Sequence, residues 1–188
     1  MKRPRLTTPA IVDGAIAIVD RDGFDALNLS AVAGELGVGP SALYTHISGL
    51  DDLQYLVAVT STGNLVSHIR NAAIGVSGAD ALTAMGNAYR EFSLEHPGQF
   101  ASTLLPPRSD DDALAQQNEQ LVAVFTLVFT AMGIANDESY LAARSTQSAL
   151  HGVLALEHNS GTTATHGAEY EHLLTTLQRG IIAQRAVD

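Results

Sequence analysis

Apolar residues recur three and four positions apart along nearly the whole chain, which is the spacing that gives a helix one buried face. The first stripe, with Ile11, Ala15 and Ile18, begins after the hydroxyl N-cap Thr8 and ends at Asp22-Gly23. Similar stripes continue toward the end of the sequence, and no segment has the alternating pattern of a half-buried strand. The sequence therefore predicts an all-α protein.

Glycine, proline and capping residues divide these stripes into about nine expected helices. Ser30 is expected to cap the second helix, and Ser109 with Asp112 to form a capping box at the start of the seventh. The run 96–98 is a strong stop, and the Gly- and Thr-rich run 159–165 is an expected loop. The expected helices are, approximately, 9–22, 30–37, 39–47, 50–73, 79–95, 100–105, 109–132, 136–158 and 166–185.

The second and third of these helices are short and are separated only by a tight turn at Gly37. Such a pair matches a helix-turn-helix, in which the turn fixes the angle between a supporting helix and a reading helix. Helical bundles without a DNA partner also contain such turns, so spacing alone leaves both interpretations open. The expected organisation is a helix-turn-helix domain at 1–49 and a helical body at 50–188.

The outer side of the third helix favours DNA as the partner. If Val38, Leu43 and Ile47 form its buried stripe, small and hydroxyl-bearing residues face outward. Ser41 can hydrogen-bond to a base edge and Ala42 can pack on a thymine methyl group, while the neighbouring tyrosine and histidine are placed to contact phosphates. The N-terminus of the second helix also suits an anion. The candidate DNA-facing residues are Ser30, Gly39, Pro40, Ser41, Ala42, Tyr44, Thr45 and His46.

At these residues the sequence resembles the TetR family of bacterial transcriptional regulators. The resemblance covers about the first 60 residues. It lies in an apolar first helix, the supporting segment LSAVAGELGV, the run Leu43-Tyr44-Thr45-His46 and the start GLDDLQYLVAV of a long helix. The resemblance implies that the candidate residues face DNA. It also implies a homodimer on a palindromic site in double-stranded DNA, more often a repressor than an activator.

The sequence departs from the family pattern at one position. The family commonly places a lysine just after the reading helix to hold a phosphate, and here that region reads Ser48-Gly49-Leu50. Phosphate binding is therefore expected to depend on hydroxyl groups, on helix N-termini and on the cationic N-terminal arm of Lys2, Arg3 and Arg5.

The charge balance is unusual for a nucleic-acid binder, because the formal net charge is -10. Residues 1–50 carry four basic and five acidic side chains, and the remainder carries six basic and fifteen acidic, so most of the acidity lies outside the expected DNA-facing part. The absence of cysteine excludes disulfides and thiolate metal sites. No apolar run has the length of a membrane helix or a signal peptide, so we expect a cytoplasmic protein without a membrane partner.

The helical body offers a place for a small-molecule effector, which the family resemblance also implies. Apolar side chains could enclose a mainly apolar ligand, with polar side chains among them as anchors, although the same residues could simply form the core. The candidate ligand-binding residues are Phe92, Phe100, Leu104, Leu121, Phe125, Phe129, Gln147 and His151, with Thr126, Arg144 and Leu154 as further candidates.

Small residues line the two C-terminal helices, the first of which Asn136 is expected to cap. They allow close packing against either a second copy or the core of the same chain. TetR-like regulators usually dimerise through their last two long helices, so the resemblance favours a homodimer. The run around His151-Gly152 also resembles a His-Gly motif of one branch of the family, without the tryptophan that often precedes it. The small residues are Ala142, Ala143, Ala149, Gly152 and Ala155.

Two other functions remain open from the sequence. A helical small-molecule-binding protein with a non-functional DNA module would account for Ser48 and for the net charge. A helical metalloenzyme would need two Glu-x-x-His motifs, and the chain has one, Glu169 with His172. No Gly-rich phosphate loop and no recognisable Ser-His-Asp arrangement is present, so neither catalysis nor a cofactor is expected.

Overall fold

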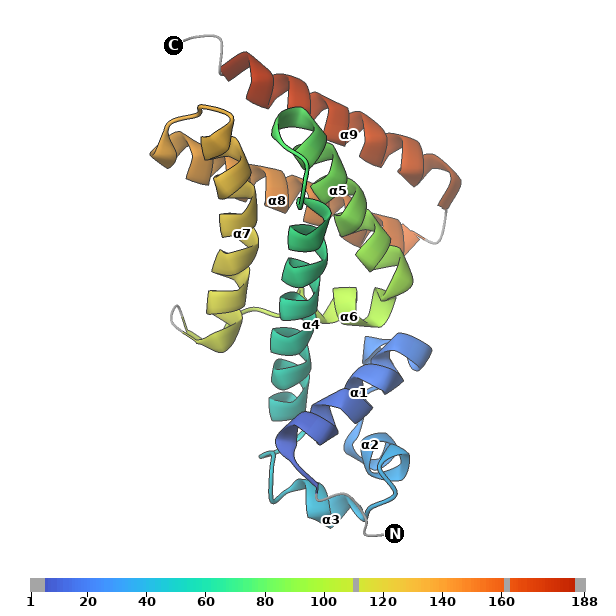
Figure 1. Cartoon of the computed structure of the whole chain (residues 1–188). Coiled ribbons are helices and arrows are strands. Elements are labelled where there is room, and N and C mark those ends of the chain that lie inside the picture. Colours follow the sequence, from blue (N-terminus) through green and yellow to red (C-terminus); the bar gives the residue numbers. More distant parts are fainter. Residues whose placement is uncertain (1–5, 110–111, 161–162, 185–188) are drawn as a thin grey trace.

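The computed structural model describes residues 6–109, 112–160 and 163–184, and within these ranges all regular structure is helical. The all-α prediction is therefore confirmed. Figure 1 shows a small group of helices, α1 to α3, joined by the long α4 to a larger group formed by α5 to α9. No helix in the described ranges is both long and apolar enough to span a membrane. The α-helices are α1 (Thr8–Asp22), α2 (Leu29–Glu35), α3 (Pro40–Leu43), α4 (Leu50–Ala72), α5 (Gly78–Glu95), α6 (Pro97–Ser102), α7 (Ala113–Ala131), α8 (Asn136–Ser160) and α9 (Thr163–Gln184).

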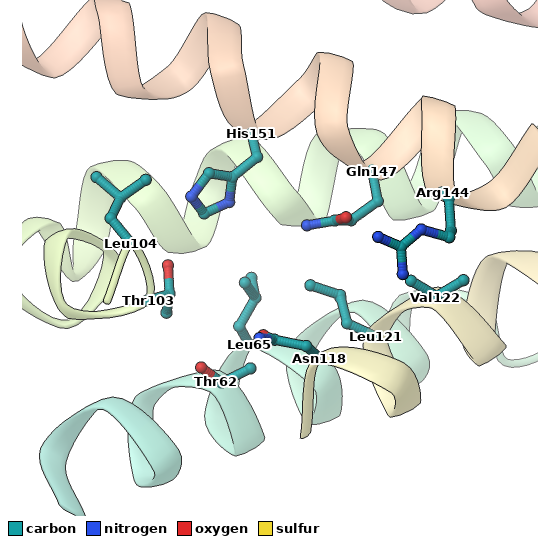
Figure 2. Close-up of a pocket in the computed structure, with 10 residues that line it drawn as sticks. All are labelled: Thr62, Leu65, Thr103, Leu104, Asn118, Leu121, Val122, Arg144, Gln147 and His151. Atoms are coloured by element: carbon teal, nitrogen blue, oxygen red, sulfur yellow. The ribbon is translucent and has the colours of Figure 1, made fainter. Parts of the chain in front are cut away.

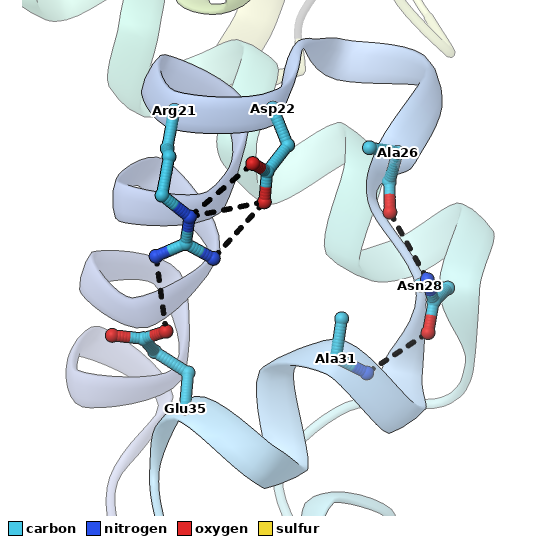
Figure 3. A network of polar contacts seen from close by, with 6 residues as sticks. All are labelled: Arg21, Asp22, Ala26, Asn28, Ala31 and Glu35. Atoms are coloured by element: carbon cyan, nitrogen blue, oxygen red, sulfur yellow. Dashed lines mark hydrogen bonds and ion pairs between the residues drawn. The ribbon is translucent and has the colours of Figure 1, made fainter.

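Two helix starts differ from those expected from the sequence. Thr7, and not Thr8, caps α1, because its side chain accepts a hydrogen bond from the N–H of Ala10 at 3.3 Å. Asn28, and not Ser30, caps α2 through the N–H of Ala31 at 2.9 Å (Figure 3). Asparagine is as good a cap as serine, and Asn28 stands one residue before the apolar stripe begins.

The turn between α2 and α3 follows the hydrogen-bond pattern of a Schellman motif. Gly37 has a φ of +65°, its N–H donates to the carbonyl of Gly34, and the N–H of Val38 donates to the carbonyl of Ala33 at 2.9 Å. The regular part of α3 ends at Leu43, earlier than predicted, and turns follow it: the Leu43 carbonyl accepts the N–H of His46 over three residues and the N–H of Ile47 over four. The reading segment is therefore one helical turn followed by irregular turns.

Two hydrophobic clusters fill the molecule, and α4 takes part in both. The N-terminal cluster joins α1, α2 and α3 to Leu53 and Val57 in the first turns of α4. The larger cluster begins with Leu65 on the same helix and continues through α5, α6, α7, α8 and α9. The two cores thus meet along α4, several residues beyond the division expected at residue 49, and this rigid helix connects the two groups.

The short helix α6 fits between α1 and α4, as Figure 1 shows. The stop predicted at 96–98 is also a helix start, because Pro97 occupies the first position of α6, where its missing N–H is not needed. Gly98 lies against the backbone of α1 so closely that a Cβ built on it would be 1.8 Å from the carbonyl oxygen of Val19. Only glycine fits this contact.

The C-terminal half also contains differences from the prediction. Asp112 accepts the N–H of Ser109 at 3.1 Å, as the expected capping box requires, but Asp112 itself is the N-cap of α7 and accepts the N–H of Ala115 at 2.8 Å, so the helix begins later than predicted. Most of the expected loop at 159–165 is helical, since α8 extends to Ser160 and α9 begins at Thr163, while residues 161 and 162 lie outside the described residues. The end expected for the last helix, at residue 185, lies outside the described residues.

Candidate functional site

The turn after α2, together with α3, presents the predicted DNA-facing side chains on the surface. Leu43 and Ile47 are buried and hold the segment on the N-terminal cluster, while Val38 is half-buried. All the candidates in this part of the chain are exposed except Ala42, which is half-buried, and Tyr44 reaches 58% exposure. Large aromatic side chains are seldom left this exposed without a partner, so the segment has the character of a binding surface.

The start of α2 adds backbone donors to this surface. The first intrahelical hydrogen bond runs from Val32 N–H to the carbonyl of Asn28, and Asn28 also receives the N–H of Ala31. The N–H groups of Leu29 and Ser30 precede this pattern and are available to an outside acceptor. Ser30 is exposed in the first turn, so its role as a helix N-terminus residue is compatible with the structure even though it is not the cap.

Cationic side chains are scarce in this part of the molecule. Lys2, Arg3 and Arg5 lie outside the described residues, and Arg21 is the single arginine or lysine between residues 6 and 69. Its guanidinium lies 3.0 Å from Asp22 and 3.3 Å from Glu35, which ties the end of α1 to the end of α2 (Figure 3). These partners are exposed, so the pairs contribute little to stability, but they already neutralise the charge of Arg21.

A cavity of about 260 Å³ lies in the larger group of helices, between α4, α7, α8 and the segment after α6 (Figure 2). Its lining combines polar and apolar side chains and is less apolar than the sequence suggested. The lining residues are Thr62, Leu65, Thr103, Leu104, Asn118, Leu121, Val122, Arg144, Gln147 and His151.

The structure brings together only part of the predicted ligand-binding set. Leu104, Leu121, Gln147 and His151 line the cavity, as does the further candidate Arg144. Phe92, Phe100, Phe125 and Phe129 are at most 3% exposed in the larger hydrophobic cluster and do not line it, and neither do Thr126 and Leu154. Thr62 is a polar residue on the apolar stripe of α4, and this signal in the sequence could have identified it as a cavity residue. For Thr103, Asn118 and the apolar Leu65 and Val122, the sequence contains no distinguishing signal.

His151 lies in the cavity wall and pairs with a buried tyrosine. The hydroxyl of Tyr89 is 2.8 Å from His151 Nδ1. Burial lowers the pKa of His151 to about 4 and raises the pKa of Tyr89 above its usual value, so both groups are uncharged at neutral pH. The hydroxyl then donates to Nδ1, which leaves the single ring proton on Nε2.

The same wall is connected to α1 through α6. The ring of His151 packs against Phe100 of α6, with 4.7 Å between the ring centroids. On the other side of α6, Gln99 Nε2 donates to Asp20 of α1 at 2.9 Å, while Gln99 Oε1 accepts from Asn64 of α4 at 2.8 Å. We call Asp20, Asn64, His96 and Gln99 the α6 joint, since His96 Nδ1 also lies 3.2 Å from Asp20. It joins the cavity wall to the helix beneath the reading segment.

Among the described residues, no three His, Asp or Glu side chains gather as they would to hold a metal ion. The geometry supports recognition, because the described residues combine an exposed surface with helix N–H groups open to an acceptor at one end and a mixed cavity at the other.

Comparisons with known proteins agree on one family. The family model described as "Tetracyclin repressor-like, C-terminal domain" matches residues 82–177. The uncharacterized HTH-type transcriptional regulator Rv0681 of Mycobacterium tuberculosis is 30% identical over 154 residues, which are 81% of this chain and 71% of that protein. The uncharacterized HTH-type transcriptional regulator YobS of Bacillus subtilis is 30% identical over 152 residues, 80% of this chain and 78% of that protein.

A solved structure extends the likeness to the whole fold. The crystal structure of BioQ with its natural double-stranded DNA operator superposes with a TM-score of 0.70 and 21% identity, and the match covers 95% of this chain and 99% of that chain. The family match, the relatives and the exposed helix-turn-helix surface lead to the same assignment, so this chain belongs to the TetR family of DNA-binding transcriptional regulators.

Proposed function

We propose that this regulator is a homodimeric repressor that binds a palindromic operator and is released from it by a small effector bound in the cavity. The observation that carries this proposal is the α6 joint. It connects α1, which supports the reading segment, to the wall of a cavity far along the chain. A protein that only bound DNA, or only bound a ligand, would not need both sites on one connected framework.

The DNA contacts are assigned by exposure and chemistry. Ser41 and Ala42, at the start of α3, are small enough to let the helix approach base edges, whereas Tyr44 and His46 are positioned for phosphate oxygens. The N-terminal residues Lys2, Arg3 and Arg5 are proposed to supply the cationic contacts that Ser48 does not. BioQ, whose fold is similar, was crystallised with a double-stranded DNA operator, which supports this mode of binding.

The homodimer is proposed to form through α8 and α9. One face of α8 exposes small residues between two leucines, at a helical spacing of three and four residues: Leu141, Ser145, Ser148, Gly152 and Leu156. The leucines are 64% and 66% exposed in the single chain. Burying them against a second copy would remove apolar surface from water and so stabilise a dimer. Of the small residues predicted to lie at the interface, Ala143 is fully buried within the chain itself, whereas Gly152 is exposed.

Dimerisation is also what operator reading requires. Two reading helices enter successive major grooves only when they are about 34 to 36 Å apart, and a single chain carries one such helix. An effector that moves α6 relative to α1 changes this separation and thus favours a dimer that no longer fits. The coupling is reciprocal, so operator DNA weakens effector binding by the same factor.

The experiment that tests the proposal is fluorescence anisotropy of the purified protein on duplexes tiling the DNA upstream of its own gene, with random duplex as competitor. Tight, sequence-specific binding by two subunits per palindrome is the expected result. Tyr44→Phe, which removes one phosphate-contacting hydroxyl, is expected to weaken specific binding several-fold. Tyr140→Phe is the matched control, because the Tyr140 hydroxyl contacts Glu119 on the distant α7.

A second candidate is a small-molecule-binding protein whose DNA module does not function. Ser48, in the region where the family commonly has a lysine, favours it, as does the net charge of -10. Binding that is blind to sequence, or absent at every salt concentration, would favour this candidate over the regulator.

A further inference from the structure

Three polar side chains of α8 form a row along one wall of the cavity. Arg144, Gln147 and His151 are spaced three and four residues apart, so they share one helix face, and Figure 2 shows them side by side above the opposite wall. The helix rises about 10 Å from Arg144 to His151. The apolar Leu65 and Leu121 lie across from the middle of the row. The cavity is thus elongated, with polar groups at both ends.

The polar lining provides mainly hydrogen-bond donors. The contacts of Arg144 with Glu119 and Tyr140 both use Nη1, so within the described part of the chain the Nε and Nη2 protons remain available as a fork. His151 contributes an Nε2–H donor, because Tyr89 occupies Nδ1. Asn118 has no hydrogen-bond partner among the described residues and offers an amide group from α7. A ligand rich in acceptor oxygens matches this lining.

The charge of the cavity lining comes from one side chain. Arg144 is the single charged side chain that lines the cavity among the described residues, since His151 is neutral, and its Nη1 is paired with Glu119 of α7 at 3.2 Å. Arg144 is about half exposed, which places the cation at the mouth of the cavity, whereas Leu65 and Leu121 are buried. This arrangement suits a ligand with an anionic group at the mouth, beside the Nε and Nη2 protons of Arg144, and an uncharged body inside. A guanidinium fork binds a carboxylate in two parallel hydrogen bonds.

We propose that the effector is a small, elongated carboxylic acid with a hydroxyl or carbonyl group at its far end. The inference rests on the proposed effector-responsive function and specifies its ligand. The carboxylate binds Arg144, the hydrocarbon middle packs between Leu65 and Leu121, and the far oxygen accepts a hydrogen bond from His151 Nε2. A cavity of about 260 Å³ is smaller than the 300 to 1,000 Å³ typical of drug-sized ligands, so the acid is a small one.

The test uses isothermal titration calorimetry on the full chain with three probes of matched length. They are 8-hydroxyoctanoate, octanoate, which lacks the far oxygen, and 1,8-octanediol, which lacks the charge. The hydroxy acid is expected to bind at least tenfold more tightly than the diol, because a charge-assisted fork is lost, and several-fold more tightly than octanoate. Arg144→Gln is expected to weaken the hydroxy acid at least tenfold and to leave the diol unchanged. Arg70→Gln is the control, since it makes the same charge change on an exposed residue outside the cavity.

Three results would overturn the proposal. These are diol binding to wild-type protein as tight as that of the acid, an unchanged affinity of Arg144→Gln for the acid, and no acid binding at millimolar concentration. Operator binding by the unliganded protein is measured separately by anisotropy. Failure of the acids with intact operator binding refutes the effector class alone, whereas absence of specific operator binding refutes the proposed function.

Discussion

Gly98 of α6 lies directly against the backbone of α1, and adding one methyl group there tests whether α6 positions α1. In Gly98→Ala, the new Cβ would lie 1.8 Å from the carbonyl oxygen of Val19 and 2.5 Å from its carbonyl carbon. Both neighbours are backbone atoms, so no side chain can rotate out of the way. Either α6 moves away from α1 or the end of α1 distorts.

The size of the effect follows from these distances. Real Cβ contacts are essentially never shorter than 3.0 Å, so α6 and α1 must separate by about 1.2 Å. Overpacking of this kind costs about 1 to 3 kcal/mol. For a chain of this size, each kcal/mol lowers Tm by about 2 to 4 °C. The hydrogen bonds from Gln99 and His96 to Asp20 span the same contact and would lengthen with it.

The assay combines thermal unfolding followed by circular dichroism with anisotropy on the operator. Gly98→Ala is expected to lower Tm and to lower operator affinity even though no DNA-facing residue has changed. Gly34→Ala is the matched control, since a Cβ there meets nothing within 4 Å and alanine is the better helix former. An unchanged Tm together with unchanged operator affinity in Gly98→Ala would refute the view that α6 holds α1 in position.

Three further predictions concern pH, salt and assembly. Unfolded histidine binds a proton near pH 6.5, whereas folded His151 does so only near pH 4, so the free energy of unfolding falls by at most about 3 kcal/mol as the pH drops from 6.5 to 4. Urea titrations of His151→Gln should show a smaller fall. An equal fall would contradict the assignment. If the arms of two subunits supply the phosphate contacts, about six phosphates are neutralised and the slope of log K against log salt is no steeper than about -5 to -6, so a much steeper slope in salt titrations would refute it. Leu156→Glu should convert the dimer to monomer in sedimentation experiments, whereas Leu94→Glu, on α5, should not, and a dimer that survives Leu156→Glu excludes this face.

The helices were predictable because each buries one stripe of apolar residues, and such a stripe appears in the sequence as a repeat of three and four residues. The residues at which the helices begin and end were less predictable. Thr7 and Thr8 are adjacent and chemically identical caps, and Asn28 and Ser30 are nearly equivalent ones, so the sequence does not decide between them. The extension of α8 beyond residue 158 runs against the local composition, because Asn159 and Ser160 are poor helix formers.

Of the two binding sites, the reading segment was predictable from the sequence and the cavity was not. The reading segment is local, so its exposed residues follow from the helix pattern and the buried Leu43 and Ile47. The cavity is not local, because an apolar stripe contains both core residues and cavity-lining residues. Phe125 and Leu121 lie one helical turn apart on α7, yet only Leu121 reaches the cavity. Asp20 and Gln99 are 79 positions apart, and nothing in the sequence indicates that they meet.

The α6 joint also has the energy scale that an effector switch needs. A hydrogen bond to a carboxylate, such as that from Gln99 to Asp20, contributes about 1.5 to 3 kcal/mol net, and a neutral one, such as that between Gln99 and Asn64, about 0.5 to 1.5 kcal/mol, so together they amount to a few kcal/mol. Measured couplings between sites are typically about 1 to 3 kcal/mol. A much stronger joint could not be opened by a small ligand, and a much weaker one would not hold α1 for the operator. Because Phe100, which contacts His151, and Gln99, which contacts Asp20, are neighbours in α6, a ligand that shifts His151 acts on these bonds through a single rigid turn of helix.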